Sequence, residues 1–143
     1  MAPILTDPLH VTSPHTKGDN VLRAQKALAK WGAPVGALDG EGGVGLGDRV
    51  ATLAWNTDRH IEIWYGAMGI GAVLHTVNPR LFPEQIAWII NHAEDKILFF
   101  DTTFIPIVEK IAPLLKTVTT YVLLTDRAHV PTGSIPHFVA YED

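Results

Sequence analysis

The sequence has no cysteine, and that absence removes disulfide bonds and thiol catalysis from the chemistry open to this chain. It has no apolar run of the roughly 18 residues that a membrane-spanning helix needs. The first residues lack a basic segment followed by an apolar one, so we expect no secretion signal and a cytoplasmic location. Basic tracts are missing too, and the net charge is −4, which argues against nucleic acid as a partner.

Motifs of the commonest catalytic centres are also absent. The seven histidines form no H-x-x-x-H or H-E-x-x-H pair, so we expect no metal site. The only serines, Ser13 and Ser134, lie outside any G-x-S-x-G motif. Residues 40–45 match G-x-G-x-x-G in letters, but a helix and loop precede them and a strand follows, which reverses the dinucleotide-binding context. We therefore expect no catalytic residue here and rank a dinucleotide-dependent oxidoreductase last among the candidate functions.

The first third of the chain looks unlike the rest. Residues 1–18 contain three prolines and few large apolar residues, which is typical of an extended arm. Asp19 or Asn20 is placed to cap a short helix that runs to about Trp31. Residues 32–47 then contain seven glycines and one proline. We interpret residues 1–46 as an N-terminal arm, a short helix and a glycine-rich linker.

From residue 48 onward, short apolar segments alternate with amphipathic ones. We expect strands at 49–54, 72–77, 97–100 and 119–124, with a weaker one at 137–140. We expect one helix from a cap at Asn56, Thr57 or Asp58 to about Ile70, and one that opens at Pro83. A third should start at a Thr102 or Thr103 cap and end near Pro113. This alternation predicts an α/β fold: a partial doubly wound, mainly parallel sheet with helices on both faces.

In such sheets, ligands bind beyond the carboxyl ends of the strands. The loops at 55–57, 78–82, 101–103 and 125–127 are therefore the candidate site. Arg80 is the most interesting residue in them, because its guanidinium could hold a phosphate or carboxylate through paired N–H donors and Pro79 would stiffen its loop. A plain surface arginine in a turn is the alternative. Asp101 follows a strand and could also belong to the site, or could be an ordinary acid at a helix start.

Three stretches together carry a family resemblance. They are Gly47-Asp-Arg-Val-Ala-Thr-Leu-Ala-Trp-Asn56, Gly69-Ile-Gly-Ala-Val-Leu-His-Thr-Val-Asn-Pro-Arg-Leu81 and Gln85-Ile-Ala-Trp-Ile-Ile-Asn-His-Ala-Glu-Asp95. This pattern resembles the adenylate-forming acyl-CoA synthetases, in particular the fatty-acid–CoA ligases and methylmercaptopropionate-CoA ligase-like enzymes. The resemblance covers residues 47–143 and implies part of the N-terminal subdomain of such a ligase.

The resemblance implies a chemistry and a few site residues. Relatives use ATP and Mg²⁺ to convert a carboxylic acid into an acyl-adenylate with release of pyrophosphate, and coenzyme A then displaces AMP. The arginine that matches Arg80 contacts the nucleotide of coenzyme A in a related aryl-CoA ligase, so Arg80 is the implied coenzyme contact. His75 and Asn78 are weaker candidates as wall residues beside it. Long-chain members dimerise through this region, so a homodimer is also implied.

The sequence departs from the family in what it leaves out. The Ser/Thr/Gly-rich phosphate loop, the aromatic-Thr-Glu motif, the ribose-binding Asp and the catalytic Lys of relatives have no counterpart in these 143 residues. The leading hypothesis is therefore a ligase fragment that is inactive by itself and binds no cofactor, or only coenzyme A. The alternative is a non-catalytic α/β module that dimerises or binds coenzyme A.

Overall fold

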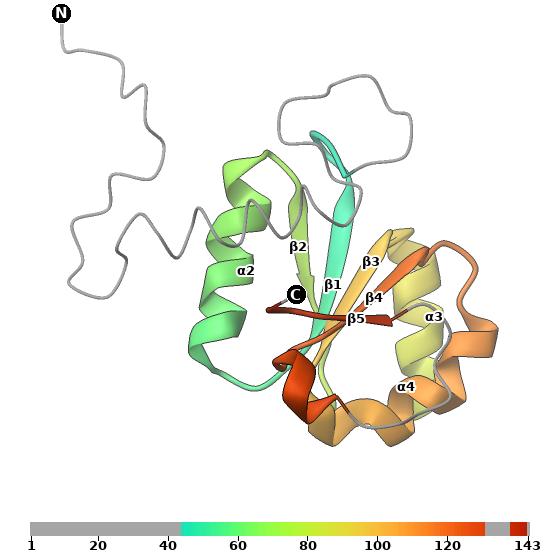
Figure 1. The fold of residues 1–143 in the computed structure, drawn as a ribbon. Helices are drawn as coiled ribbons and strands as arrows, with labels where there is room; N and C mark the ends of the chain where they lie inside the picture. Colours follow the sequence, from blue (N-terminus) through green and yellow to red (C-terminus); the bar gives the residue numbers. More distant parts are fainter. Residues whose placement is uncertain (1–43, 131–137, 143) are drawn as a thin grey trace, which may run out of the picture.

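The computed structural model describes residues 44–130 and 138–142. In that part, five parallel strands form one sheet in the order β2-β1-β3-β4-β5 (Figure 1). Each strand lies within one residue of its predicted bounds: β1 Arg49–Leu53, β2 Val73–Thr76, β3 Ile97–Phe100, β4 Thr120–Leu123 and β5 Phe138–Ala140. The predicted α/β fold class is confirmed. The arm, helix and glycine-rich linker predicted before residue 44 lie outside the described residues.

Helices cover both faces of this sheet (Figure 1). Helix α2 (Asp58–Gly69) packs on one face, whereas α3 (Pro83–Ala93) and α4 (Ile105–Ile111) pack on the other. Because β2 and β3 flank β1 on opposite sides, the chain winds away from β1 in both directions. This is the doubly wound arrangement. Within residues 44–130 and 138–142, no helix has the length and apolar character to cross a membrane.

Strand β3 shows why the sequence forms a sheet that is covered on both sides. All four of its residues are buried, with Ile97 and Phe99 packed toward α2 and the alternate residues toward α3 and α4. Side chains of a strand point alternately to its two faces. A strand with helices on both faces is therefore apolar at every position, and β3 reads Ile-Leu-Phe-Phe.

Two of the three predicted helix starts are confirmed. Thr57 caps α2, and its Oγ1 accepts the His60 N–H at 3.3 Å. Pro83 occupies the first turn of α3, where its missing N–H costs little. There the Gln85 side chain accepts the free Phe82 N–H at 3.2 Å.

The third predicted helix is wrong in its start and its continuity. It divides into a 3₁₀ turn at Thr102–Phe104, α4, and a second 3₁₀ turn at Ala112–Leu114, and no threonine side chain caps α4. Pro106 explains the first break, because it has no N–H to bond to the Thr102 carbonyl four residues earlier. The Ile105 N–H takes that carbonyl instead, in the tighter 3₁₀ geometry.

Candidate functional site

The carboxyl ends of β1 and β3 form the switch point of this sheet, since the chain leaves β1 toward α2 and leaves β3 toward α4. Trp55 bridges the two loops there. Its backbone N–H donates to Asp101 Oδ2 at 2.5 Å, and its indole N–H donates to Thr103 Oγ1 at 2.9 Å. The ring also packs against Phe104, with the centroids 5.0 Å apart. The place where doubly wound sheets usually bind ligands is therefore tied together by the protein's own groups.

His60, in the first turn of α2, contacts the backbone of Trp55 and holds it in place. Its side chain is buried, and its Nδ1 lies 3.1 Å from the Trp55 carbonyl oxygen. Its Nε2 lies 2.9 Å from Thr52 Oγ1 and 3.1 Å from Trp64 Nε1. Because an indole N–H can only donate, Nε2 is an acceptor and the proton sits on Nδ1. The geometry therefore suits a neutral imidazole that holds the loop after β1.

The electrostatics of His60 agree with this assignment. Burial lowers the pKa of His60 below its ordinary value, although the bond to the Trp55 carbonyl and the charge of Asp101 both act to raise that pKa. Sequence reasoning missed this cluster. The signal for it was Thr52, a polar residue inside an otherwise apolar strand, with a histidine eight residues later at the start of a helix.

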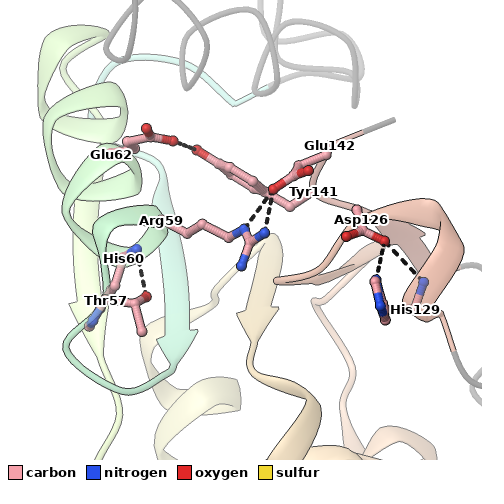
Figure 2. A network of polar contacts seen from close by, with 8 residues as sticks. All are labelled: Thr57, Arg59, His60, Glu62, Asp126, His129, Tyr141 and Glu142. Atoms are coloured by element: carbon pink, nitrogen blue, oxygen red, sulfur yellow. Dashed lines mark hydrogen bonds and ion pairs between the residues drawn. The ribbon is translucent and has the colours of Figure 1, made fainter. Parts of the chain in front are cut away.

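A second set of polar contacts closes the carboxyl ends of β4 and β5 (Figure 2). Arg59 of α2 forms an ion pair with Glu142, just after β5. The neighbouring Tyr141 donates its hydroxyl to Glu62 at 2.9 Å, and burial together with that carboxylate raises the pKa of Tyr141. These contacts join the last described residues to α2, far from them in sequence.

The loop after β4 is closed by its own residues. Asp126 accepts the His129 backbone N–H at 3.0 Å and lies 2.6 Å from His129 Nδ1 (Figure 2). This capping starts the 3₁₀ turn Arg127–His129. The predicted candidate loop at 125–127 thus has its acidic group engaged within its own turn.

The loop after β2 differs, because its bonds are local to the turn and its charged side chain, that of Arg80, is exposed. Asn78 Oδ1 accepts the Arg80 backbone N–H at 2.9 Å, and the Asn78 carbonyl oxygen accepts the Leu81 N–H at 3.3 Å. These two bonds and Pro79 define a tight turn at the edge strand of the sheet. Arg80 is exposed, and among residues 44–130 and 138–142 its guanidinium has no hydrogen bond or ion pair. The structure thus brings Asn78 and Arg80 together.

His75, the third predicted site residue, has a different contact. Its Nδ1 lies 2.6 Å from Oδ2 of Asp95, a fully buried carboxylate between α3 and β3. The other oxygen of Asp95, Oδ1, has no hydrogen-bond partner in the described part of the chain. His75 therefore ties β2 to the segment that leads into β3, and its role as a wall residue stays a prediction.

The metal of the implied reaction has no cluster of ligands among the described residues. Residues 44–130 and 138–142 hold no group of three or more His, Asp or Glu side chains placed to bind a metal ion. Most of the glycine-rich segment at 40–45 lies outside the described residues. Arg80 is different, since a free guanidinium on a stiff turn fits a phosphate group.

Comparison with known proteins assigns the family. The model of the AMP-binding enzyme family matches residues 36–140, most of the chain. The chain belongs to the AMP-binding enzymes. A 3-methylmercaptopropionyl-CoA ligase of Ruegeria pomeroyi is 51% identical over 109 residues, which are 76% of this chain and 20% of the relative. A long-chain-fatty-acid–CoA ligase of Thermus thermophilus is 52% identical over 101 residues, which are 71% of this chain and 18% of the relative.

Solved structures agree with the fold. A structure from Rhodopseudomonas palustris, assigned as a long-chain-fatty-acid CoA ligase, superposes with a TM-score of 0.66 at 27% identity. The match covers 87% of this chain and 27% of that one. The resemblance to fatty-acid–CoA ligases expected from the sequence is confirmed. The chain spans about a fifth of the length of the curated ligases it matches.

Proposed function

We propose that this chain is one piece of an ATP-dependent acid–CoA ligase and that its contribution is a coenzyme A contact through Arg80. The observation that carries the proposal is the Arg80 guanidinium on the turn after β2, which is exposed and has no bond within the described part of the chain. Membership of the AMP-binding family and relatives named as CoA ligases support the reaction class. In that reaction a fatty or related carboxylic acid, ATP and coenzyme A give acyl-CoA, AMP and pyrophosphate.

Calorimetric titration with coenzyme A tests the Arg80 contact. A charge-assisted bond to phosphate is worth about 1.5–3 kcal/mol, so Arg80→Ala should weaken binding about tenfold or more. Lys110→Ala is the matched control, because it removes an exposed cation on α4 and should leave binding unchanged. Equal affinity of the wild-type chain and Arg80→Ala would refute the contact.

We also propose that the chain alone does not complete the reaction. Phosphoryl and adenylyl chemistry depends on groups positioned around the phosphates, and the sequence lacks the phosphate loop and catalytic lysine of relatives. Acid-dependent exchange between ATP and pyrophosphate should stay at background for the isolated chain and appear when the missing ligase regions are supplied as a fusion. Clear exchange by the chain itself would sink this part of the proposal.

An apolar stripe on α2 supports association with a further surface. Ile61, Trp64 and Met68 follow one another at helical spacing and are 46%, 41% and 52% exposed. Large apolar side chains grouped in this way mark a contact surface. We propose that the remainder of a ligase covers this stripe. The alternative is that a second copy of the chain covers it in a homodimer. Sedimentation over a concentration series separates the two, because only self-association depends on the concentration of this chain. We also propose a cytoplasmic location.

A further inference from the structure

An open pocket runs along the first two turns of α3 and begins at the turn that carries Arg80. Its volume is about 390 Å³, within the range of small-molecule sites. The lining residues are Leu81, Glu84, Gln85, Trp88 and Ile89. Leu81 follows Arg80 directly, so the turn that carries Arg80 also contributes to the lining of the pocket.

Trp88 gives this pocket a stacking surface. Its side chain is 64% exposed, and its ring lies nearly parallel to the His92 ring at a centroid distance of 4.8 Å. An exposed indole is a good platform for a flat aromatic ligand such as a nucleobase.

Glu84 is the only ionisable group in the lining, and it determines which base fits. A carboxylate only accepts hydrogen bonds, and Glu84 forms none with the rest of the described chain. The other polar residue, Gln85, has its oxygen engaged by the Phe82 N–H. Glu84 therefore suits a base that carries an exocyclic amine, and it repels phosphate, which belongs on Arg80 outside the pocket.

We propose that this pocket binds the adenine ring of a nucleotide whose phosphate rests on Arg80. The inference rests on the proposed function, which identifies that nucleotide as the 3′-phosphorylated ADP portion of coenzyme A. Trp88 stacks on the base, and the Glu84 carboxylate accepts a hydrogen bond from the exocyclic amine of adenine. A hydrocarbon chain fits less well, because it would bury the Glu84 carboxylate without a donor and leave Arg80 unused.

Calorimetry with adenosine 3′,5′-bisphosphate as the probe tests the stacking surface. The wild-type chain should bind it saturably, and Trp88→Ala should weaken binding about tenfold or more. Trp88→Leu should bind as weakly, since it keeps apolar bulk but removes the aromatic face. Leu114→Ala is the matched control: it truncates an exposed apolar side chain outside the pocket and should not change the affinity. Weaker binding of 5′-AMP than of the bisphosphate would assign the pocket to coenzyme A over ATP.

Inosine 3′,5′-bisphosphate tests the role of Glu84, because it replaces the amine with a carbonyl. The wild-type chain should prefer the adenosine probe about tenfold, the effect of losing one bond to a charged group. Glu84→Gln should narrow that preference, since the amide can also donate to a carbonyl. An unchanged preference in Glu84→Gln would contradict the assignment.

The outcomes separate this inference from the proposed function. If Arg80→Ala weakens coenzyme A binding while Trp88→Ala and Glu84→Gln bind the probe like wild type, the pocket assignment is wrong and the Arg80 contact stands. If the wild-type chain binds neither coenzyme A nor the probe, both fall. If Trp88→Ala lowers self-association in sedimentation and leaves probe affinity unchanged, the pocket is an interface between copies and the adenine assignment is wrong.

Discussion

The loops after β1 and after β2 leave the same edge of the sheet but differ in how their polar groups are used. In the loop after β1, Trp55 bonds to groups on two other segments, the loop after β3 and the first turn of α2. In the loop after β2, the bonds of Asn78 are local to the turn, and the Arg80 side chain is exposed. Groups bonded within the protein stabilise the fold, whereas a positioned and unpaired group is available for a ligand. The comparison predicts opposite effects of mutation on stability and on binding.

The largest effect on the free energy of unfolding should come from substituting His60. His60→Ala leaves the Trp55 carbonyl, the Thr52 hydroxyl and the Trp64 indole N–H without their shared partner, and we expect a loss of about 3 kcal/mol in the free energy of unfolding. Urea denaturation followed by circular dichroism measures it. Trp64→Phe removes only one of these bonds and should cost about 1 kcal/mol. A loss below about 1 kcal/mol for His60→Ala would show that this cluster contributes little.

A smaller loss of unfolding free energy should follow from removing the hydrogen bond between Trp55 and Asp101. Asp101→Ala removes the acceptor of the Trp55 N–H, and we expect a cost of about 1–2 kcal/mol. Asp101→Asn keeps an acceptor oxygen and should recover part of the loss. The same urea titrations apply. If Asn proves no better than Ala, the bond does not explain the effect of Asp101.

Stability should also depend on pH through His60. The pKa of His60 is lowered in the folded state, so at mildly acidic pH the unfolded chain binds more protons than the folded one. This contribution is fully present above the unfolded pKa of about 6.5 and is lost as pH falls through the lowered folded value. Urea midpoints between pH 7.5 and 5 should fall more steeply for wild type than for His60→Ala. Parallel curves would mean that another group causes the dependence.

These two loops also show which parts of the structure were predictable from sequence. The turn at Asn78 could be foreseen, because an asparagine side chain bonds to its own backbone two residues later and a proline stiffens the same stretch. The Trp55–Asp101 bond joins residues 46 positions apart, and no local pattern specifies it. For the same reason the sequence favours an ordinary loop or helix-start acid at Asp101 over a site residue and does not indicate its bond to Trp55. The break before α4 has a local signal in Pro106, which lacks a backbone N–H, and the expected continuous helix from Thr102 or Thr103 did not take it into account.

The smallest effect on stability should come from Arg80. Arg80→Ala removes an exposed side chain with no bond in the described part of the chain, so unfolding should change by no more than about 0.5 kcal/mol. Asn78→Ala removes the acceptor of the Arg80 backbone N–H, at a cost of about 0.5–1 kcal/mol. The two substitutions should nevertheless couple in coenzyme A binding, because Asn78 acts only by fixing the turn that presents Arg80.

A double-mutant cycle on the affinity for coenzyme A measures that coupling. If Asn78 acts through Arg80, its substitution should weaken binding in the wild-type background and have little effect once Arg80 is alanine. Additive losses would mean that Asn78 contacts the ligand itself, as a wall residue would. The two loops have separate roles if Arg80→Ala weakens coenzyme A binding without changing the free energy of unfolding. Asp101→Ala should then do the opposite: it should lower the free energy of unfolding and leave coenzyme A binding unchanged. The reverse pattern would place the ligand at the switch point, with Trp55 displaced to admit it.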